Sequence, residues 1–91
     1  MKNLDRLHVV KNALRAKYTW PGAYPLYLAM SDGEALSIDA AREHWRDICR
    51  AILTDDWRGE WFARDVLINF EDSDLYCVHT GRRIECAYPP V

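Results

Sequence analysis

The chain has 91 residues, with four Trp, five Tyr and two Phe, and its net charge is −2. This length predicts a single domain, residues 1–91, whose small core leaves little room for a deep active site. No apolar run is long enough to cross a membrane, and the acidic balance is opposite to that of a strongly basic nucleic-acid-binding domain.

The first predicted element is a helix from about Leu4 to Lys17. Its apolar residues recur at helical spacing and form one stripe: Leu4, Leu7, Val10 and Leu14. Asn3 is expected to be the N-cap. The helix should stop before Pro21-Gly22, because this pair breaks helices.

A β-hairpin is predicted next, with strands at 23–30 and 35–36. Apolar and aromatic residues flank the turn Ser31-Asp32-Gly33-Glu34, and an Asp-Gly pair in this setting is a strong hairpin indicator. Only two or three residues remain for the return strand before the next helix.

The clearest predicted element is a helix that begins after the N-cap Ser37 and ends near Thr54. Its apolar residues form one face: Ile38, Ala41, Trp45, Ile48 and Ile52. On the polar face each arginine has an acid three residues earlier, as Asp39–Arg42, Glu43–Arg46 and Asp47–Arg50. Each pair contributes about 0.2–0.5 kcal/mol, and the face should be nearly neutral.

After a loop at 55–60, alternating apolar residues predict a longer strand from about Trp61 to Phe70. Its inward positions are Phe62, Val66, Ile68 and Phe70. A turn at 71–74 leads into a second hairpin at 75–77 and 84–86. The predicted fold is therefore α+β, a small antiparallel sheet of two hairpins plus a longer strand, packed against two helices.

The sequence carries no pattern typical of an enzyme. Cys49 and Cys77 are expected to be small buried residues, and His8 and His44 lie in predicted helices without a local catalytic partner. Three cysteines cannot all pair within one chain, and the N-terminus lacks the apolar core of a secretory signal. Both observations favour a reducing cytoplasm, and a Cys77–Cys86 disulfide stays open as an alternative.

The segment 51–76 is the acidic part of the chain, with seven acids against two arginines. Six of the seven acids fall into two turns that flank the predicted strand: Asp55, Asp56 and Glu60 before it, and Glu71, Asp72 and Asp74 after it. Trp57 and Trp61 lie beside the first group, where an exposed Trp would suit an interface. The alternative is that both Trp side chains belong to the core and the acids are ordinary turn residues.

The segments 20–27, 31–33, 35–37 and 69–77 through Tyr88 resemble a family of short proteins whose genes are mostly carried by phages, plasmids and integrated elements. The resemblance covers roughly 20–88. Related members resemble degenerate zinc ribbons, with one Cys-x-x-Cys pair after the first hairpin and another in the closing hairpin.

On this chain those four positions are Ser37, Ala40, Cys77 and Thr80, so only one is a thiolate ligand. A structural zinc site needs four. We therefore expect no metal and no cofactor, and a closing hairpin held by its own packing, chiefly Leu75, Tyr76, Ile84 and Tyr88.

The leading prediction is a non-enzymatic accessory protein of a mobile element in the cytoplasm of a bacterial host. The resemblance and the acidic segment together suggest an inhibitor of the anti-CRISPR type, which binds the basic surface of a defence complex. The predicted contact residues are the eight side chains of the two acidic turns: Asp55, Asp56, Trp57, Glu60, Trp61, Glu71, Asp72 and Asp74.

Two alternatives remain open. One is a small nucleic-acid-binding or regulatory protein that uses Arg42, Arg46, Arg50, Arg82 and Arg83, although near-neutral pairing makes direct nucleic-acid binding the less favoured reading. The other is a structural homodimer that pairs through an edge strand.

Overall fold

A computed structural model describes residues 3–19 and 22–88, and the α+β prediction is confirmed. The elements follow one another along the chain as α1 Asn3–Ala16, β1 Leu26–Met30, β2 Ala35–Ser37, α2 Ile38–Glu43, α3 Trp45–Leu53 and β3 Ala63–Ile68. Trp20 and Pro21, which belong to the predicted helix breaker and the resemblance, lie outside the described residues. Within residues 3–19 and 22–88, no helix has the length and apolarity to cross a membrane.

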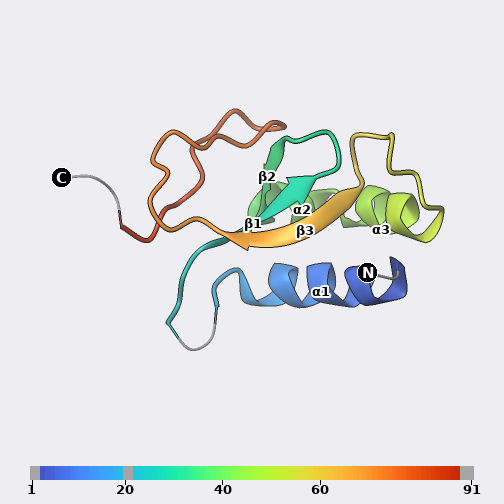
Figure 1. The fold of residues 1–91 in the computed structure, drawn as a ribbon, viewed down its shortest axis with the longest axis horizontal. Coiled ribbons are helices and arrows are strands. Elements are labelled where there is room, and N and C mark those ends of the chain that lie inside the picture. The colour runs from blue at the N-terminus through green and yellow to red at the C-terminus, as the bar shows by residue number, and fades with distance from the viewer. Residues whose placement is uncertain (1–2, 20–21, 89–91) are drawn as a thin grey trace.

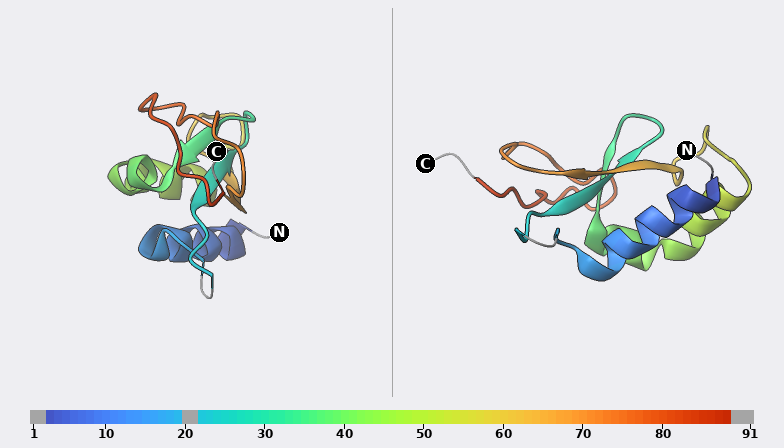
Figure 2. Two further views of the ribbon diagram at one scale, coloured as in Figure 1. Left: turned by 90° about the vertical axis from the view of Figure 1, so that its left-hand side faces the viewer. Right: turned by 60° about the horizontal axis from the view of Figure 1, so that its bottom comes forward.

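The sheet is antiparallel with the strand order β2-β1-β3. The predicted first hairpin is confirmed, since β1 and β2 pair across the turn at 31–34. Gly33 has a φ of +89°, which glycine adopts without steric cost, and the Asp32 carboxylate accepts a hydrogen bond from the Glu34 N–H at 3.0 Å. All three helices lie on one side of this sheet (Figures 1 and 2).

The prediction of one continuous second helix is wrong, because this segment forms two helices, α2 and α3. His44, with φ −111° and ψ 23°, interrupts it between α2 and α3. The break lets α2 pack on β1 and β2 while α3 packs along α1, and such tertiary contacts outweigh helix propensity over short segments. The Ser37 cap is confirmed by its hydrogen bond from the Ala40 N–H at 3.2 Å.

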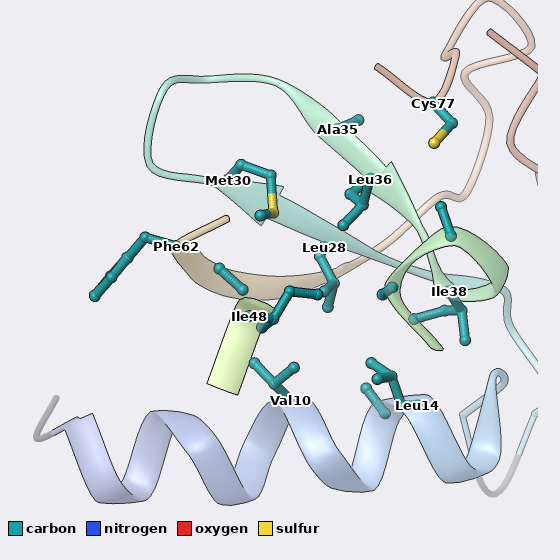
Figure 3. Packing of buried hydrophobic residues seen from close by; sticks show 14 of the residues in the cluster. Val10, Leu14, Leu28, Met30, Ala35, Leu36, Ile38, Ile48, Phe62 and Cys77 are labelled. Atoms are coloured by element: carbon teal, nitrogen blue, oxygen red, sulfur yellow. The ribbon is translucent and has the colours of Figure 1, made fainter. Parts of the chain in front are cut away.

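The core lies between the sheet and the helices (Figure 3). Val10 and Leu14 of α1 face Ile48 of α3 and Leu28 of β1, and all four are buried. Leu4 was predicted in the same stripe but is 61% exposed, because the start of α1 extends past the sheet. Asn3 lies inside the helix; its side chain contacts Arg6 and Asp55 rather than capping the N-terminus.

The closing segment differs most from the prediction. β3 is shorter than expected, and Phe70, predicted to face inward, is 47% exposed because the chain turns after Asn69. The hairpin at 75–86 forms only an isolated bridge between Tyr76 and Arg83.

The packing of this hairpin also differs from expectation. Cys77 and Ile84 are buried and Leu75 packs on the core, but Tyr76 and Tyr88 are 54% and 56% exposed. The main-chain N–H of Val78 donates to the carbonyl of Ala35 at 2.9 Å. The hairpin therefore occupies part of the outer edge of β2, and β3 forms the other edge of the sheet.

Candidate functional site

The first acidic turn, 55–60, is fixed at the end of α3. Asp55 has a positive φ of 56°, and its carboxylate accepts a hydrogen bond of 3.0 Å from the Asn3 side chain of α1. The Ser31 hydroxyl donates to the main-chain carbonyl of Trp57, which joins this turn to the β1–β2 turn. Asp55, Asp56 and Glu60 are all exposed.

The two tryptophans beside this turn have different environments. Trp57 is 54% exposed, so the alternative that it is a core residue is wrong. The guanidinium of Arg58 lies 4.8 Å from the Trp57 ring centroid and covers part of the indole. Trp61 is half-buried and packs against the core, as that alternative predicted for it.

Trp61 is also part of an aromatic cluster that no sequence pattern indicated. The His44 ring stacks on it at 4.5 Å between centroids, and His79 lies 5.5 Å from Trp61 and 4.4 Å from His44. The break between α2 and α3 presents His44 here, and the tip of the closing hairpin brings His79. These residues are remote in sequence, so only the tertiary fold joins them.

The second acidic turn, Glu71 to Asp74, depends on the buried side chain of Asn69. The Asn69 amide donates hydrogen bonds of 3.0 Å to the main-chain carbonyls of both Asp72 and Glu85. Its oxygen accepts a bond of 3.2 Å from the Asp72 N–H. Asn69 therefore joins the turn to the return arm of the closing hairpin, a role that composition alone could not reveal.

Three aromatic rings adjoin this second turn, of which Phe70 and Tyr88 are exposed and Tyr24 is half-buried. Phe70 and Tyr24 pack edge to face with their centroids 5.3 Å apart, and Tyr88 lies 6.0 Å from Tyr24. The Tyr88 hydroxyl donates to that of Tyr24 at 3.1 Å. We call this surface the aromatic-acidic end and define it by six residues: Tyr24, Phe70, Glu71, Asp72, Asp74 and Tyr88.

The two acidic turns lie at opposite ends of β3 (Figure 1). A six-residue strand spans about 20 Å, so the predicted contact residues do not form one compact site. A small ligand could contact only one of the two groups. A single partner reaching both would need a surface of protein size.

The four zinc-ribbon positions do come together. The Ser37 N–H donates to the Cys77 sulfur at 3.4 Å, and Ser37, Ala40 and Thr80 line one cavity of about 400 Å³. Burial raises the pKa of the Cys77 thiol, but hydrogen bonds involving Ser37 and Thr80 outweigh it and bring the pKa from 9.0 down to about 7.

The donors needed for metal at this position are missing from the described residues. His79 points to the aromatic cluster, and no group of three or more His, Cys, Asp or Glu side chains in residues 3–19 and 22–88 is arranged to hold a metal ion. Cys49, Cys77 and Cys86 are free thiols, so Cys77 and Cys86 do not form the disulfide left open above.

The predicted ion pairs on α2 and α3 form only in part. Arg42 lies 3.9 Å from Asp39, but Asp47 contacts His44 at 3.4 Å instead of Arg50. Arg46 makes no ion pair with any described residue. Arg82 and Arg83 line a different cavity, beside Glu43, so the five arginines of the nucleic-acid alternative do not share one surface.

Comparison with known proteins does not assign this chain to a family. No protein-family model matches the chain, no curated protein matches it, and no solved structure matches it. The likeness to mobile-element proteins therefore stays a prediction carried by the sequence motifs.

Proposed function

We propose that this protein acts without catalysis, by binding a basic surface of a protein partner through its aromatic-acidic end. One observation carries the proposal: exposed rings of Phe70 and Tyr88 stand beside an acidic turn that the buried Asn69 holds in place. The carboxylates of Glu71 and Asp74 have no partner among the described residues. They are therefore available to Lys or Arg of another protein.

This end suits a basic partner better than the first acidic turn does. Arg58 places a cation inside the first turn and covers Trp57, while Asp55 already accepts a hydrogen bond from Asn3. No Lys or Arg occurs between residues 65 and 81, so the second turn keeps its full negative charge. The first turn would then add long-range attraction rather than the central contacts.

The aromatic and the charged side chains of this end would contribute to partner binding in different ways. Aromatic side chains supply most of the affinity at protein interfaces, because they bury a large area with little loss of rotamer freedom. Charged groups around them raise the association rate and select partners of opposite sign. Binding of this kind blocks whatever else the basic surface would hold.

The partner we propose is a bacterial defence complex of the CRISPR type, whose basic channel normally holds nucleic acid. The support is the sequence resemblance to mobile-element proteins together with the negative charge of both turns. The mechanism would be occlusion, in which one protein molecule replaces nucleic acid on the basic surface.

A titration tests both the partner and the absence of catalysis. Purified CRISPR-type effector complexes, each loaded with its guide, are mixed with labelled target DNA and increasing amounts of the protein. We expect at least one complex to lose DNA binding completely, and only when about one equivalent of the protein is present. Complete loss at a small fraction of an equivalent would show turnover and contradict the non-catalytic mechanism, and no loss with any complex would contradict the partner.

A further inference from the structure

A basic groove, which we call the α1/α3 groove, begins between α1 and α3 and continues along α3, away from the aromatic-acidic end. α1 and α3 lie side by side and antiparallel (Figure 2, right), and the Asn3–Asp55 hydrogen bond joins the start of one to the residues that follow the other. One part of the groove, about 280 Å³, is lined by Lys11, Leu14, Arg15, Arg42 and Trp45. A second hollow, about 500 Å³, shares Trp45 with the first and lies on α3 and its C-cap alone, lined by Trp45, Arg46, Cys49, Arg50, Leu53 and Thr54.

The charge of this groove is entirely positive. Five cationic side chains line it and no carboxylate does. Lys11, Arg15, Arg46 and Arg50 make no ion pair with any described residue, and Arg42 shares its charge with Asp39. Of the other acids on α2 and α3, Asp47 contacts His44 and Glu43 lines a different cavity with Arg82 and Arg83, while Asp39 also contacts Lys17 at 3.2 Å.

The floor of the groove is apolar and contains an aromatic ring. Trp45 is half-buried and lines both parts, while Leu14, which is buried, lines the first part and Leu53, which is 60% exposed, lines the second. Proteins that bind single-stranded nucleic acid combine these two elements, cations that follow the phosphates and an aromatic ring on which a base stacks. A duplex offers phosphates but no free base for Trp45.

We propose that the α1/α3 groove binds a single strand of DNA or RNA. Lys11 and Arg15 contact phosphates on one side of Trp45, and Arg46 and Arg50 contact phosphates on the other. A base stacks against Trp45 between them. The first acidic turn follows Thr54 at one end of the groove and repels the strand there, while the aromatic-acidic end lies away from it, so binding is confined to this groove and weakens steeply with salt.

The salt dependence gives a quantitative test with a fluorescent oligothymidylate and a matching oligouridylate of about 12 nucleotides. Four cations that each neutralise one phosphate of a single strand predict a slope of log K against log salt of about −3. Raising salt from about 50 to about 200 mM should therefore weaken binding about 50-fold, measured by fluorescence anisotropy. No binding at the lower salt, or a slope near zero, would overturn the proposal.

Charge-reversal pairs locate the site. K11E/R15E on α1 and R46E/R50E on α3 should each weaken binding at least tenfold and reduce the magnitude of the salt slope by about 1.4. The matched control is R82E/R83E on the closing hairpin, which makes the same charge change outside the groove and should weaken binding about twofold or less. Equal losses in all three variants would show a general charge effect and overturn the assignment.

The variant W45F tests whether a base stacks on Trp45. It keeps a ring on the groove floor and should weaken strand binding several-fold, while circular dichroism checks that the fold is intact.

The kind of polyanion that the groove prefers is tested with the wild-type protein. A duplex of the same length and vesicles of phosphatidylglycerol are the competing ligands. Tighter binding to the duplex or to the vesicles than to the single strand would show that the groove prefers one of those ligands, and it would overturn the proposal.

Discussion

Asn69 and Asp72 exchange two hydrogen bonds, one of 3.0 Å from the Asn69 amide to the Asp72 carbonyl and one of 3.2 Å from the Asp72 N–H to the Asn69 oxygen. Asn69 is 3% exposed and its amide also donates to the carbonyl of Glu85 at 3.0 Å. One buried side chain thereby fixes the acidic turn against the closing hairpin. The geometry of the aromatic-acidic end depends on it.

Replacing Asn69 with Leu should therefore destabilise the protein. The substitution keeps the branched shape of the side chain but leaves part-buried main-chain groups of Asp72 and Glu85 without their Asn69 partner, and an unsatisfied polar group in such a place costs about 1–3 kcal/mol. We expect the free energy of unfolding to fall by about 2 kcal/mol or more in urea denaturation. Glu71→Gln, an exposed change on the same turn, is the control and should stay within about 0.5 kcal/mol.

The two tryptophans near the first turn should differ in their contribution to stability. Trp61 packs on the core and stacks with His44, so Trp61→Ala should cost about 3 kcal/mol. Trp57 is mostly exposed, and Trp57→Ala should cost about 1 kcal/mol or less. Thermal and urea denaturation measure both losses, and equal losses would contradict the difference in burial between the two indole rings.

Local patterns predicted much of this fold. The spacing of apolar residues in 38–52 and the Asp32-Gly33 pair indicated a helix and a hairpin, because both depend on neighbours in sequence. The break at His44 was missed, since it depends on how α2 and α3 pack on different partners. The exposure of Phe70 was missed too, because alternation cannot show where a strand ends.

The candidate sites were less predictable. The sequence identified both acidic turns but not the rings of Tyr24 and Tyr88 that adjoin the second one, since long-range packing brings them there. It also treated Arg46 and Arg50 as paired with acids three residues earlier. In the fold Asp47 contacts His44 instead, a choice that depends on side-chain rotamers and on tertiary neighbours.

The thiol of Cys77 makes stability depend on pH. Because its pKa is lowered from 9.0 to about 7, the unfolded chain binds more protons between about pH 7 and 9, and stability should rise with pH across that window. The gain, on the order of 2 kcal/mol, is lost as pH falls through the folded pKa, and Cys77→Ala should lack it. Thiolate absorbance of a C49S/C86S variant measures the pKa directly, and a midpoint above pH 8.5 would contradict it.

The convergence of the zinc-ribbon positions predicts an engineered metal site. Ser37 and Thr80 both contact the Cys77 thiol, and Ala40 lines the same cavity as those two residues. The variant S37C/A40C/T80C should therefore bind one zinc ion per chain, and with Co²⁺ it should show thiolate charge-transfer absorption. The same variant with Cys77→Ala is the control, and equal metal binding by both would contradict the convergence.

A comparison of two charge reversals tests whether the aromatic-acidic end makes the contact with the protein partner. E71K/D74K reverses two carboxylates that have no partner among the described residues, while D56K/E60K makes the same charge change at the other end of β3. In the titration against a responsive effector complex, the first variant should need at least tenfold more protein for half-maximal inhibition, and the second about threefold at most. Half-maximal inhibition by E71K/D74K at the concentration that the parent protein needs, or a larger loss for D56K/E60K, would contradict this assignment.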